Sequence, residues 1–159
     1  MSFTVMGVTA GRKNSNCEIL LKEALLECQK LGAEVRMINL KDFNIIDCNG
    51  CTSCTMGMSM GKYAGCSLDK ADDKKKIMDV MLDQDAVIFA APTYDLMPSS
   101  VYTRFSHRFL AYELSFLLKI GKVAEDPHQV AGLIAVGGSC KDWQGLSLDT
   151  LSATMVTQS

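Results

Sequence analysis

The sequence predicts an α/β fold in which helices cover both faces of a parallel sheet. Apolar runs at residues 3–8, 86–91 and 130–136 each have the length of a buried strand. Segments with apolar residues at helical spacing alternate with these runs. Strands that alternate with helices form an open, doubly wound sheet, because each right-handed crossover places its helix on a face of the sheet. We therefore expect one three-layer α/β/α domain over residues 1–159.

The first half of the chain predicts two strands, one helix and a long loop. Ser15 stands three residues before Glu18 in the spacing of a capping box, and apolar residues then recur at helical intervals until Gly32. Residues 35–40 are a second strand candidate, because their apolar side chains share one face at a period of two. Residues 41–71 are expected to be mostly loop.

The second half predicts three helices around the two buried strands. The acidic pair at 72–73 is favourable in the first turn of a helix, and the lysines at 74–76 are expected to lie on its solvated face. Pro92 is expected to end the strand before it, and Ser99 or Ser100 is expected to cap the next helix. The chain ends after a fourth helix, so we expect either a truncated sequence or a sheet that lacks its fifth strand and is completed by a partner.

Composition excludes several classes of partner. The chain has 16 Lys and Arg against 18 Asp and Glu, a formal net charge of −2, and no long basic run. This balance argues against binding to nucleic acid or to a membrane surface. No apolar stretch approaches the roughly 20 residues of a membrane span, and the N-terminus lacks the pattern of a signal peptide. We therefore expect a cytoplasmic protein.

The loop at 9–17 has the parts of a phosphate-binding site. In open α/β sheets, ligands bind where loops leave the carboxyl ends of the strands. The first amides of a helix attract anions, Ser15 and Asn16 can donate side-chain hydrogen bonds, and Arg12 adds positive charge. The loop lacks both GxxxxGK[ST] and GxGxxG, so a monophosphate such as that of FMN fits better than a nucleoside triphosphate or a dinucleotide. An ordinary capped helix start remains the alternative.

Two further loops could hold a flavin ring. The segment at 92–98 offers a rigid turn, an aromatic side chain at Tyr94 and backbone amides. The pair Gly137 and Gly138 would allow the backbone to approach the ring closely. The alternative interpretation of Tyr94 is a core residue in a loop bounded by prolines.

Cysteine is abundant, with seven residues in the chain, and four of them lie within nineteen positions. Disulfides are rare in a reducing compartment, so the cluster indicates a metal or redox site. Cys48, Cys51 and Cys54 have two residues between neighbours, and Cys66 follows after eleven. This pattern favours a 4Fe-4S cluster, because close spacings turn thiolates toward one centre that a distant fourth can close. Zinc, which more often uses two separated pairs, and free or redox-active cysteines remain alternatives.

Three motifs in order resemble the NADPH-dependent FMN reductase family, which has a flavodoxin-like fold. TAGRKNSNC at 9–17 resembles the family's GSPRKNSNT, and APTYD at 91–95 resembles SPVYF. FSHR at 105–108 resembles FxDR, with histidine in place of aspartate. The cysteine-rich region at 48–66, read as an insertion, with the acidic pair at 72–73, is similar to the iron-sulfur flavoprotein subfamily. The eleven residues between Cys54 and Cys66 make a longer spacing than is usual in that subfamily.

The resemblance implies an FMN-dependent oxidoreductase in which a 4Fe-4S cluster lies beside the flavin. It also implies a ferredoxin or NAD(P)H donor, a small-molecule acceptor and a homodimer or homotetramer. No side chain is assigned as a catalytic acid or base, because the flavin carries the chemistry. The predicted metal ligands are Cys48, Cys51, Cys54 and Cys66. The predicted cofactor-binding residues are Thr9, Ala10, Arg12, Ser15, Asn16, Cys17, Pro92, Thr93, Tyr94, Asp95, Leu96, Met97, Gly137, Gly138 and Ser139.

Two other functions remain open. The first is a cluster-free NAD(P)H:FMN or quinone reductase, in which hydride passes through the flavin alone. The second is a noncatalytic flavin-binding electron carrier, which the expected lack of a fifth strand favours. Iron content distinguishes the cluster-free reductase from the iron-sulfur flavoprotein. Turnover of NAD(P)H with a quinone by the isolated chain would count against the noncatalytic carrier.

Overall fold

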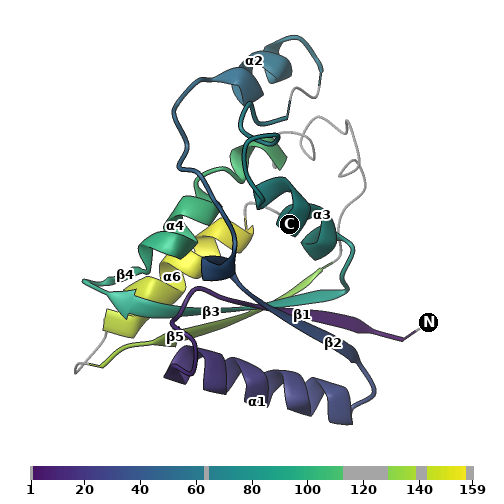
Figure 1. Cartoon of the computed structure of the whole chain (residues 1–159), viewed down its shortest axis with the longest axis vertical. Helices are drawn as coiled ribbons and strands as arrows, with labels where there is room; N and C mark the ends of the chain where they lie inside the picture. Colours follow the sequence, from purple (N-terminus) through teal and green to yellow (C-terminus); the bar gives the residue numbers. More distant parts are fainter. Residues whose placement is uncertain (1, 63–64, 113–128, 139–142, 157–159) are drawn as a thin grey trace.

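A parallel sheet forms the centre of the molecule, as expected (Figure 1). The computed structural model describes residues 2–62, 65–112, 129–138 and 143–156. Four parallel strands lie in the order β2-β1-β3-β5, which matches the first four positions of a flavodoxin-like sheet. A fifth, two-residue strand pairs antiparallel with the end of β3. The strands are β1 (Thr4–Thr9), β2 (Glu34–Asn39), β3 (Ala86–Tyr94), β4 (Met97–Pro98) and β5 (Val130–Val136).

Helices cover both faces of this sheet, which confirms the three-layer, doubly wound arrangement (Figure 1). On one face, α1 buries Leu21 and Leu25 against β1 and β3. On the other, α3, α4 and α6 enclose a larger core that includes Met78, Phe105 and Leu151. The α2 helix stands away from the layers (Figure 1). The helices are α1 (Asn16–Lys30), the 3-10 helix η1 (Leu40–Asp42), α2 (Ser53–Ser59), α3 (Lys74–Leu82), α4 (Ser100–Ser106) and α6 (Trp143–Val156).

A close approach between α1 and β1 depends on a glycine. A Cβ atom added at Gly7 would lie 2.7 Å from Leu25 Cδ1 and 3.1 Å from Leu21 Cδ1. Both leucines are buried, so their side chains have little room to move. Only glycine at this position lets α1 pack this close to β1. The separation of α1 from β1 in turn determines where the first turn of α1 lies relative to the ends of the strands.

Several expected boundaries differ from the observed ones. The expected end of the strand at Pro92 is wrong, because β3 continues to Tyr94. The ladder between β1 and β3 ends at Ala90, so the missing N–H of Pro92 breaks no pair with β1. The described residues of the segment 41–71 are mostly loop, as expected, but they also contain the end of η1 and all of α2. The third helix begins at Lys74, with Asp73 as its N-cap residue.

Strand β5 is the least covered strand of the sheet. It pairs with β3, and within the part of the chain that the structure describes no strand pairs with its other edge. Val130 is 62% exposed, and no residue of β5 reaches full burial. The five strands formed by the described residues thus include the short β4 but no long parallel strand beyond β5. No helix among the described residues combines the length and the apolar character that a membrane crossing requires.

Candidate functional site

The loop between β1 and α1 leaves a hydroxyl group without a partner. Ser15 is the N-cap residue of α1, but its side chain does not cap the helix, contrary to the capping-box expectation. Glu18 instead accepts a hydrogen bond from the backbone N–H of Asn14, at 2.8 Å. Ser15 Oγ is buried and has no hydrogen-bond partner in the described parts of the chain. The first turn of α1 therefore presents free donors to an anion.

The loop after β3 contains a second buried hydroxyl group of this kind. Thr93 Oγ1 is buried without a partner among the described residues. Tyr94 is 54% exposed, so its interpretation as a core residue is wrong. Asp95 and Leu96 both have positive φ angles, 46° and 70°, and form the tight turn that joins β3 to β4. This turn places Tyr94 at the surface beside the strand end.

One cavity of about 320 Å³ joins these two loops with the end of β5. It brings together nine of the residues predicted to bind the cofactor. Asn14 and Val136 also line it; Asn14 belongs to the RKNSN motif but was not assigned a role. The predicted residues in the lining are Arg12, Ser15, Asn16, Cys17, Pro92, Thr93, Tyr94, Gly137 and Gly138.

The other predicted cofactor residues do not line this cavity. Thr9 and Ala10 are fully buried, and Thr9 Oγ1 accepts a hydrogen bond from the N–H of Gly11 at 3.1 Å. These two residues therefore support the loop from its buried side and do not line the cavity. The turn residues Asp95 and Leu96, with Met97, lie beyond the lining. Ser139 lies outside the described residues.

The cavity fits a flavin mononucleotide in its donor chemistry. Two buried hydroxyl groups have no hydrogen-bond partner within the described ranges of the chain. Arg12 supplies positive charge, and the N-terminus of α1 faces the same space. Cys17 lies at the first turn of α1 and is buried; burial raises the pKa of its thiol. A buried, protonated Cys17 is a small apolar contact and not a reactive group.

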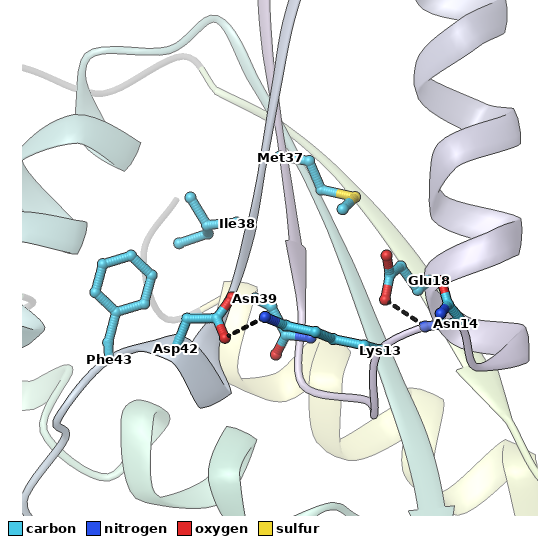
Figure 2. A pocket seen from close by; sticks show the side chains of 8 residues that line it. All are labelled: Lys13, Asn14, Glu18, Met37, Ile38, Asn39, Asp42 and Phe43. Atoms are coloured by element: carbon cyan, nitrogen blue, oxygen red, sulfur yellow. Dashed lines mark hydrogen bonds and ion pairs between the residues drawn. The ribbon is translucent and has the colours of Figure 1, made fainter.

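A second cavity of about 320 Å³ lies at the end of β2 (Figure 2). Lys13 and Asp42 form an ion pair within it, with 3.1 Å between Nζ and Oδ1. A hydrogen bond from Lys22 and one from the N–H of Asn14 lower the pKa of Glu18, so it stays ionised. This cavity could not be predicted from the sequence, because its walls come from three separate elements. The lining residues are Lys13, Asn14, Glu18, Met37, Ile38, Asn39, Asp42 and Phe43.

The four cysteines predicted as metal ligands do not converge in the structure. Among the described residues, which include all four, no three side chains of His, Cys, Asp or Glu gather as a metal site. Cys48 and Cys51 are exposed, while Cys54 and Cys66 are half-buried. The sulfur of Cys51 lies 3.4 Å from Ser53 Oγ and 3.0 Å from Ser67 Oγ. Hydrogen bonds to these two serines lower its pKa to about 7.

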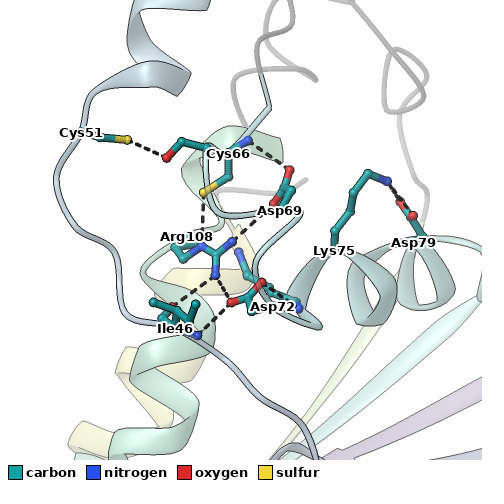
Figure 3. A network of polar contacts seen from close by, with 10 residues as sticks. Ile46, Cys51, Cys66, Asp69, Asp72, Lys75, Asp79 and Arg108 are labelled. Carbon is teal, nitrogen blue, oxygen red and sulfur yellow. Dashed lines mark hydrogen bonds and ion pairs between the residues drawn. The ribbon is translucent and has the colours of Figure 1, made fainter.

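Arg108 holds Cys66 within a buried polar network (Figure 3). Its Nε donates to Cys66 Sγ at 3.2 Å, and its Nη1 donates to the Asp72 carboxylate and to the carbonyl of Ile46. Its Nη2 pairs with Asp69 at 3.4 Å. The arginine side chain is only 1% exposed. The FSHR motif thus contributes a residue that anchors the cysteine-rich segment, a role that the sequence pattern alone does not indicate.

Lys74 is the second buried cation near this network. The expectation of a solvated lysine face is wrong for Lys74, which is 0% exposed. Its Nζ lies 5.6, 4.8 and 5.1 Å from the ring centres of Phe105, Phe109 and Tyr112. It has no hydrogen-bond partner within the described ranges. Burial and then the nearby charge of Arg108 lower the pKa of Lys74 to about 7.

Curated relatives of the chain include iron-sulfur flavoproteins. One from Archaeoglobus fulgidus is 32% identical over 90 residues, which cover 57% of this chain and 40% of the relative. One from Methanosarcina thermophila is 26% identical over 141 residues, which cover 88% and 65%. The chain therefore spans less than two thirds of the length of these relatives.

Solved structures support the fold. A flavone reductase superposes with a TM-score of 0.70 at 20% identity, and the match covers 98% of this chain and 50% of that one. At this identity the likeness concerns the flavodoxin-like fold alone. The model of the NADPH-dependent FMN reductase family matches residues 4–149, which include both loops of the first cavity and the strands that carry them. The chain belongs to the NADPH-dependent FMN reductase family.

Proposed function

We propose that the chain binds FMN in the cavity between the β1–α1 and β3–β4 loops and acts as a flavin-dependent oxidoreductase. One observation carries the proposal. Ser15 Oγ and Thr93 Oγ1 are buried and have no hydrogen-bond partner among the described residues, and both lie on loops that line the same cavity. A buried hydroxyl group without a hydrogen bond is costly, so two in one cavity support a polar ligand there.

The residues of this cavity divide between the two ends of the nucleotide. Arg12, Ser15 and Asn16 would hold the phosphate at the N-terminus of α1. Tyr94 and the paired glycines at 137–138 would lie along the flavin ring, where glycine permits close backbone approach. When bound, FMN supplies redox chemistry in steps of one or two electrons. The protein orients the ring and supplies no acid or base to that scheme.

The electron partners follow from the family. We propose NAD(P)H or a ferredoxin as donor, a small molecule as acceptor, and a homodimer or homotetramer as the assembly. The family model, described as NADPH-dependent, supports a nicotinamide donor. Iron-sulfur flavoproteins among the relatives support a one-electron partner.

We also propose that Cys48, Cys51, Cys54 and Cys66 hold a 4Fe-4S cluster. The support is their spacing and the similarity to iron-sulfur flavoproteins. The described arrangement does not bring three of the sulfurs to one centre, so binding would require residues 48–54 to move toward Cys66. No electron-transfer step is assigned to the cluster.

A cluster-free reductase is the second candidate, and one observation favours it. Cys66 already accepts a hydrogen bond from Arg108, and Cys51 is in contact with Ser67. These contacts give two of the four sulfur atoms a hydrogen-bonding partner without a metal. In this form the cysteines would be free thiols, and electrons would pass through the flavin alone.

An anaerobic reconstitution separates these possibilities. The chain is mixed with FMN, iron and sulfide, desalted, and assayed for flavin, iron and visible absorption. Bound flavin with four iron atoms per chain supports the cluster, and bound flavin without iron supports the cluster-free form. A colourless product without flavin contradicts the FMN proposal. NADH and NADPH oxidation with a quinone acceptor then tests turnover.

A matched pair of threonine variants tests the position of the flavin. Thr93→Ala removes an unpartnered hydroxyl group from the cavity, whereas Thr103→Ala removes one on α4 that donates to the carbonyl of Ser100. We expect Thr93→Ala to weaken FMN binding about tenfold and Thr103→Ala to leave it unchanged. Equal affinity in both variants would place the flavin elsewhere.

A further inference from the structure

Two successive carbonyl groups of the β1–α1 loop accept hydrogen bonds from side chains of other elements. Ser99, the buried N-cap residue of α4, donates from Oγ to the carbonyl of Ala10 at 3.2 Å. Asn39, the buried last residue of β2, donates from Nδ2 to the carbonyl of Gly11 at 3.1 Å. Two distant parts of the chain therefore fix two neighbouring peptide groups of this loop.

The hydrogen bond from Asn39 also fixes the direction of one backbone amide. In a trans peptide group, the C=O and the N–H of the next residue point in opposite directions. The peptide group between Gly11 and Arg12 is trans, and its carbonyl points toward Asn39, so the N–H of Arg12 points away from Asn39. This N–H has no acceptor among the described residues. Arg12 lines the proposed FMN cavity, whereas Asn39 does not, so the fixed amide is available to an anion there.

The side-chain amide of Asn39 is itself held in one orientation. Its Oδ1 accepts a hydrogen bond from the N–H of Lys41 at 3.0 Å, while its Nδ2 donates to Gly11. Turning the amide over would set oxygen against oxygen and N–H against N–H. The ion pair of Lys13 with Asp42 lies beside Asn39 and joins the loop to η1 at a second point (Figure 2). The end of β2 is thus a firm support for the β1–α1 loop.

We propose that Asn39 is a positioning residue that aims the backbone N–H of Arg12 at the phosphate of FMN. A phosphate oxygen is attracted by an N–H and repelled by a carbonyl oxygen, so the orientation of this peptide group changes the affinity. Asn39 does not line the cavity and acts through the loop. The proposal rests on the proposed function, because it needs the phosphate at the start of α1. It predicts that Asn39 contributes to binding of the phosphate and not to binding of the flavin ring.

Riboflavin, which lacks the phosphate, separates this role from a general structural one. Quenching of flavin fluorescence during titration with the full chain gives the affinities for FMN and for riboflavin. We expect the unchanged chain to bind FMN more tightly. Asn39→Ala should weaken FMN binding about tenfold and change riboflavin binding by less than about twofold. Asn44→Ala alters an exposed asparagine outside the cavity lining and should change neither affinity.

Backbone amide spectra test the direction of the Arg12 N–H. In proton–nitrogen correlation spectra of the unchanged chain, we expect FMN to move the Arg12 amide proton downfield and riboflavin to leave it nearly in place. The reason is that only the phosphate accepts a hydrogen bond at this position. Asn39→Ala should reduce the downfield shift. If that variant does not fold, the response of Arg12 in the unchanged chain decides.

Equal losses of FMN and riboflavin binding in Asn39→Ala would overturn the inference, since a structural role affects both ligands alike. The same holds if FMN binding is unchanged in that variant, if the Arg12 amide does not respond to FMN, or if the unchanged chain binds FMN and riboflavin equally well. Failure of the unchanged chain to bind either flavin would overturn the proposed FMN site instead.

Discussion

The guanidinium group of Arg108 donates a hydrogen bond from Nε to the sulfur of Cys66, across 42 residues of sequence, at 3.2 Å. The same side chain binds the buried carboxylate of Asp72. One arginine thus joins the end of the cysteine-rich segment to the segment that follows α4. Because a planar guanidinium offers several donors in fixed directions, it can hold both partners at once.

Arg108→Lys should lower the free energy of unfolding by about 2–4 kcal/mol, because a lysine keeps the charge but cannot satisfy the carboxylate and the sulfur together. Urea denaturation measures the change. Arg104→Lys is the control, since Arg104 is partly exposed and pairs with the exposed Asp47. Similar effects in the two variants would show that the buried network contributes little.

Ser15→Ala should weaken FMN binding about tenfold while changing the stability of the ligand-free chain by less than about 0.5 kcal/mol. The reason is that Ser15 Oγ has no partner in the described protein to lose. Quenching of flavin fluorescence gives the affinity. Ser100→Ala, at the exposed start of α4, should change neither quantity. A large loss of stability in Ser15→Ala would instead indicate a structural hydroxyl group.

Lys74→Met should stabilise the chain at neutral pH and remove a dependence of stability on pH. The folded pKa of Lys74 is about 7, below the ordinary value of 10.5. Between these values the unfolded chain binds the proton and the folded chain does not, so the free energy of unfolding rises with pH, by at most about 1.4 kcal/mol per unit. Below about pH 7 the full cost of the buried charge is present.

Urea denaturation from pH 6 to pH 9.5 checks this prediction. The unchanged chain should become more stable across the range, and Lys74→Met should show a weaker rise. Lys76→Met is the control, because Lys76 lies on the same helix and is exposed. A rise of the same size in Lys74→Met and in the unchanged chain would contradict the prediction.

Cys51 in the metal-free chain should react with iodoacetamide half-maximally near its pKa of about 7, because the thiolate is the reactive form. Ser67→Ala removes one of the two hydrogen bonds that lower this pKa and should move the midpoint toward 9.0, the ordinary value. Mass spectrometry of the labelled peptide measures the rate. Ser59→Ala, on α2, should leave the midpoint in place; an equal shift there would indicate a different cause.

Gly7→Ala should destabilise the chain by about 1–3 kcal/mol, since the added methyl group would overlap Leu25 and crowd Leu21. Gly145→Ala provides the contrast. Gly145 lies within α6, and a Cβ there has nothing within 4 Å, so higher helix propensity should stabilise the chain by about 0.5–1 kcal/mol. Thermal unfolding of both variants should show midpoints that move in opposite directions.

The layered sheet could be predicted from the sequence because each pattern that indicates a strand or a helix lies within a short stretch of the chain. The run at 86–91 is apolar over the length of one strand, and the helix before Gly32 repeats at one period. The end of β3 was not predictable in this way. Whether Pro92 breaks a strand depends on where the neighbouring ladder with β1 ends, and that is set by the register between distant residues.

The cavity that we propose for FMN was largely predictable, since parallel strands place the loops that follow them at one edge of the sheet. The burial of Lys74 was not, because the aromatic rings of Phe105, Phe109 and Tyr112 follow it by thirty residues or more. The cavity at the end of β2 was missed for a similar reason. Its walls meet only after α1, β2 and η1 have packed together.

Strand β5 carries seven uncharged residues, and among the described residues its outer edge faces no other strand. A strand edge without a neighbour is a template to which another strand can add, and a lysine on such an edge opposes that pairing. The residues Val130–Val136 include no lysine and no other charged side chain that could serve this purpose.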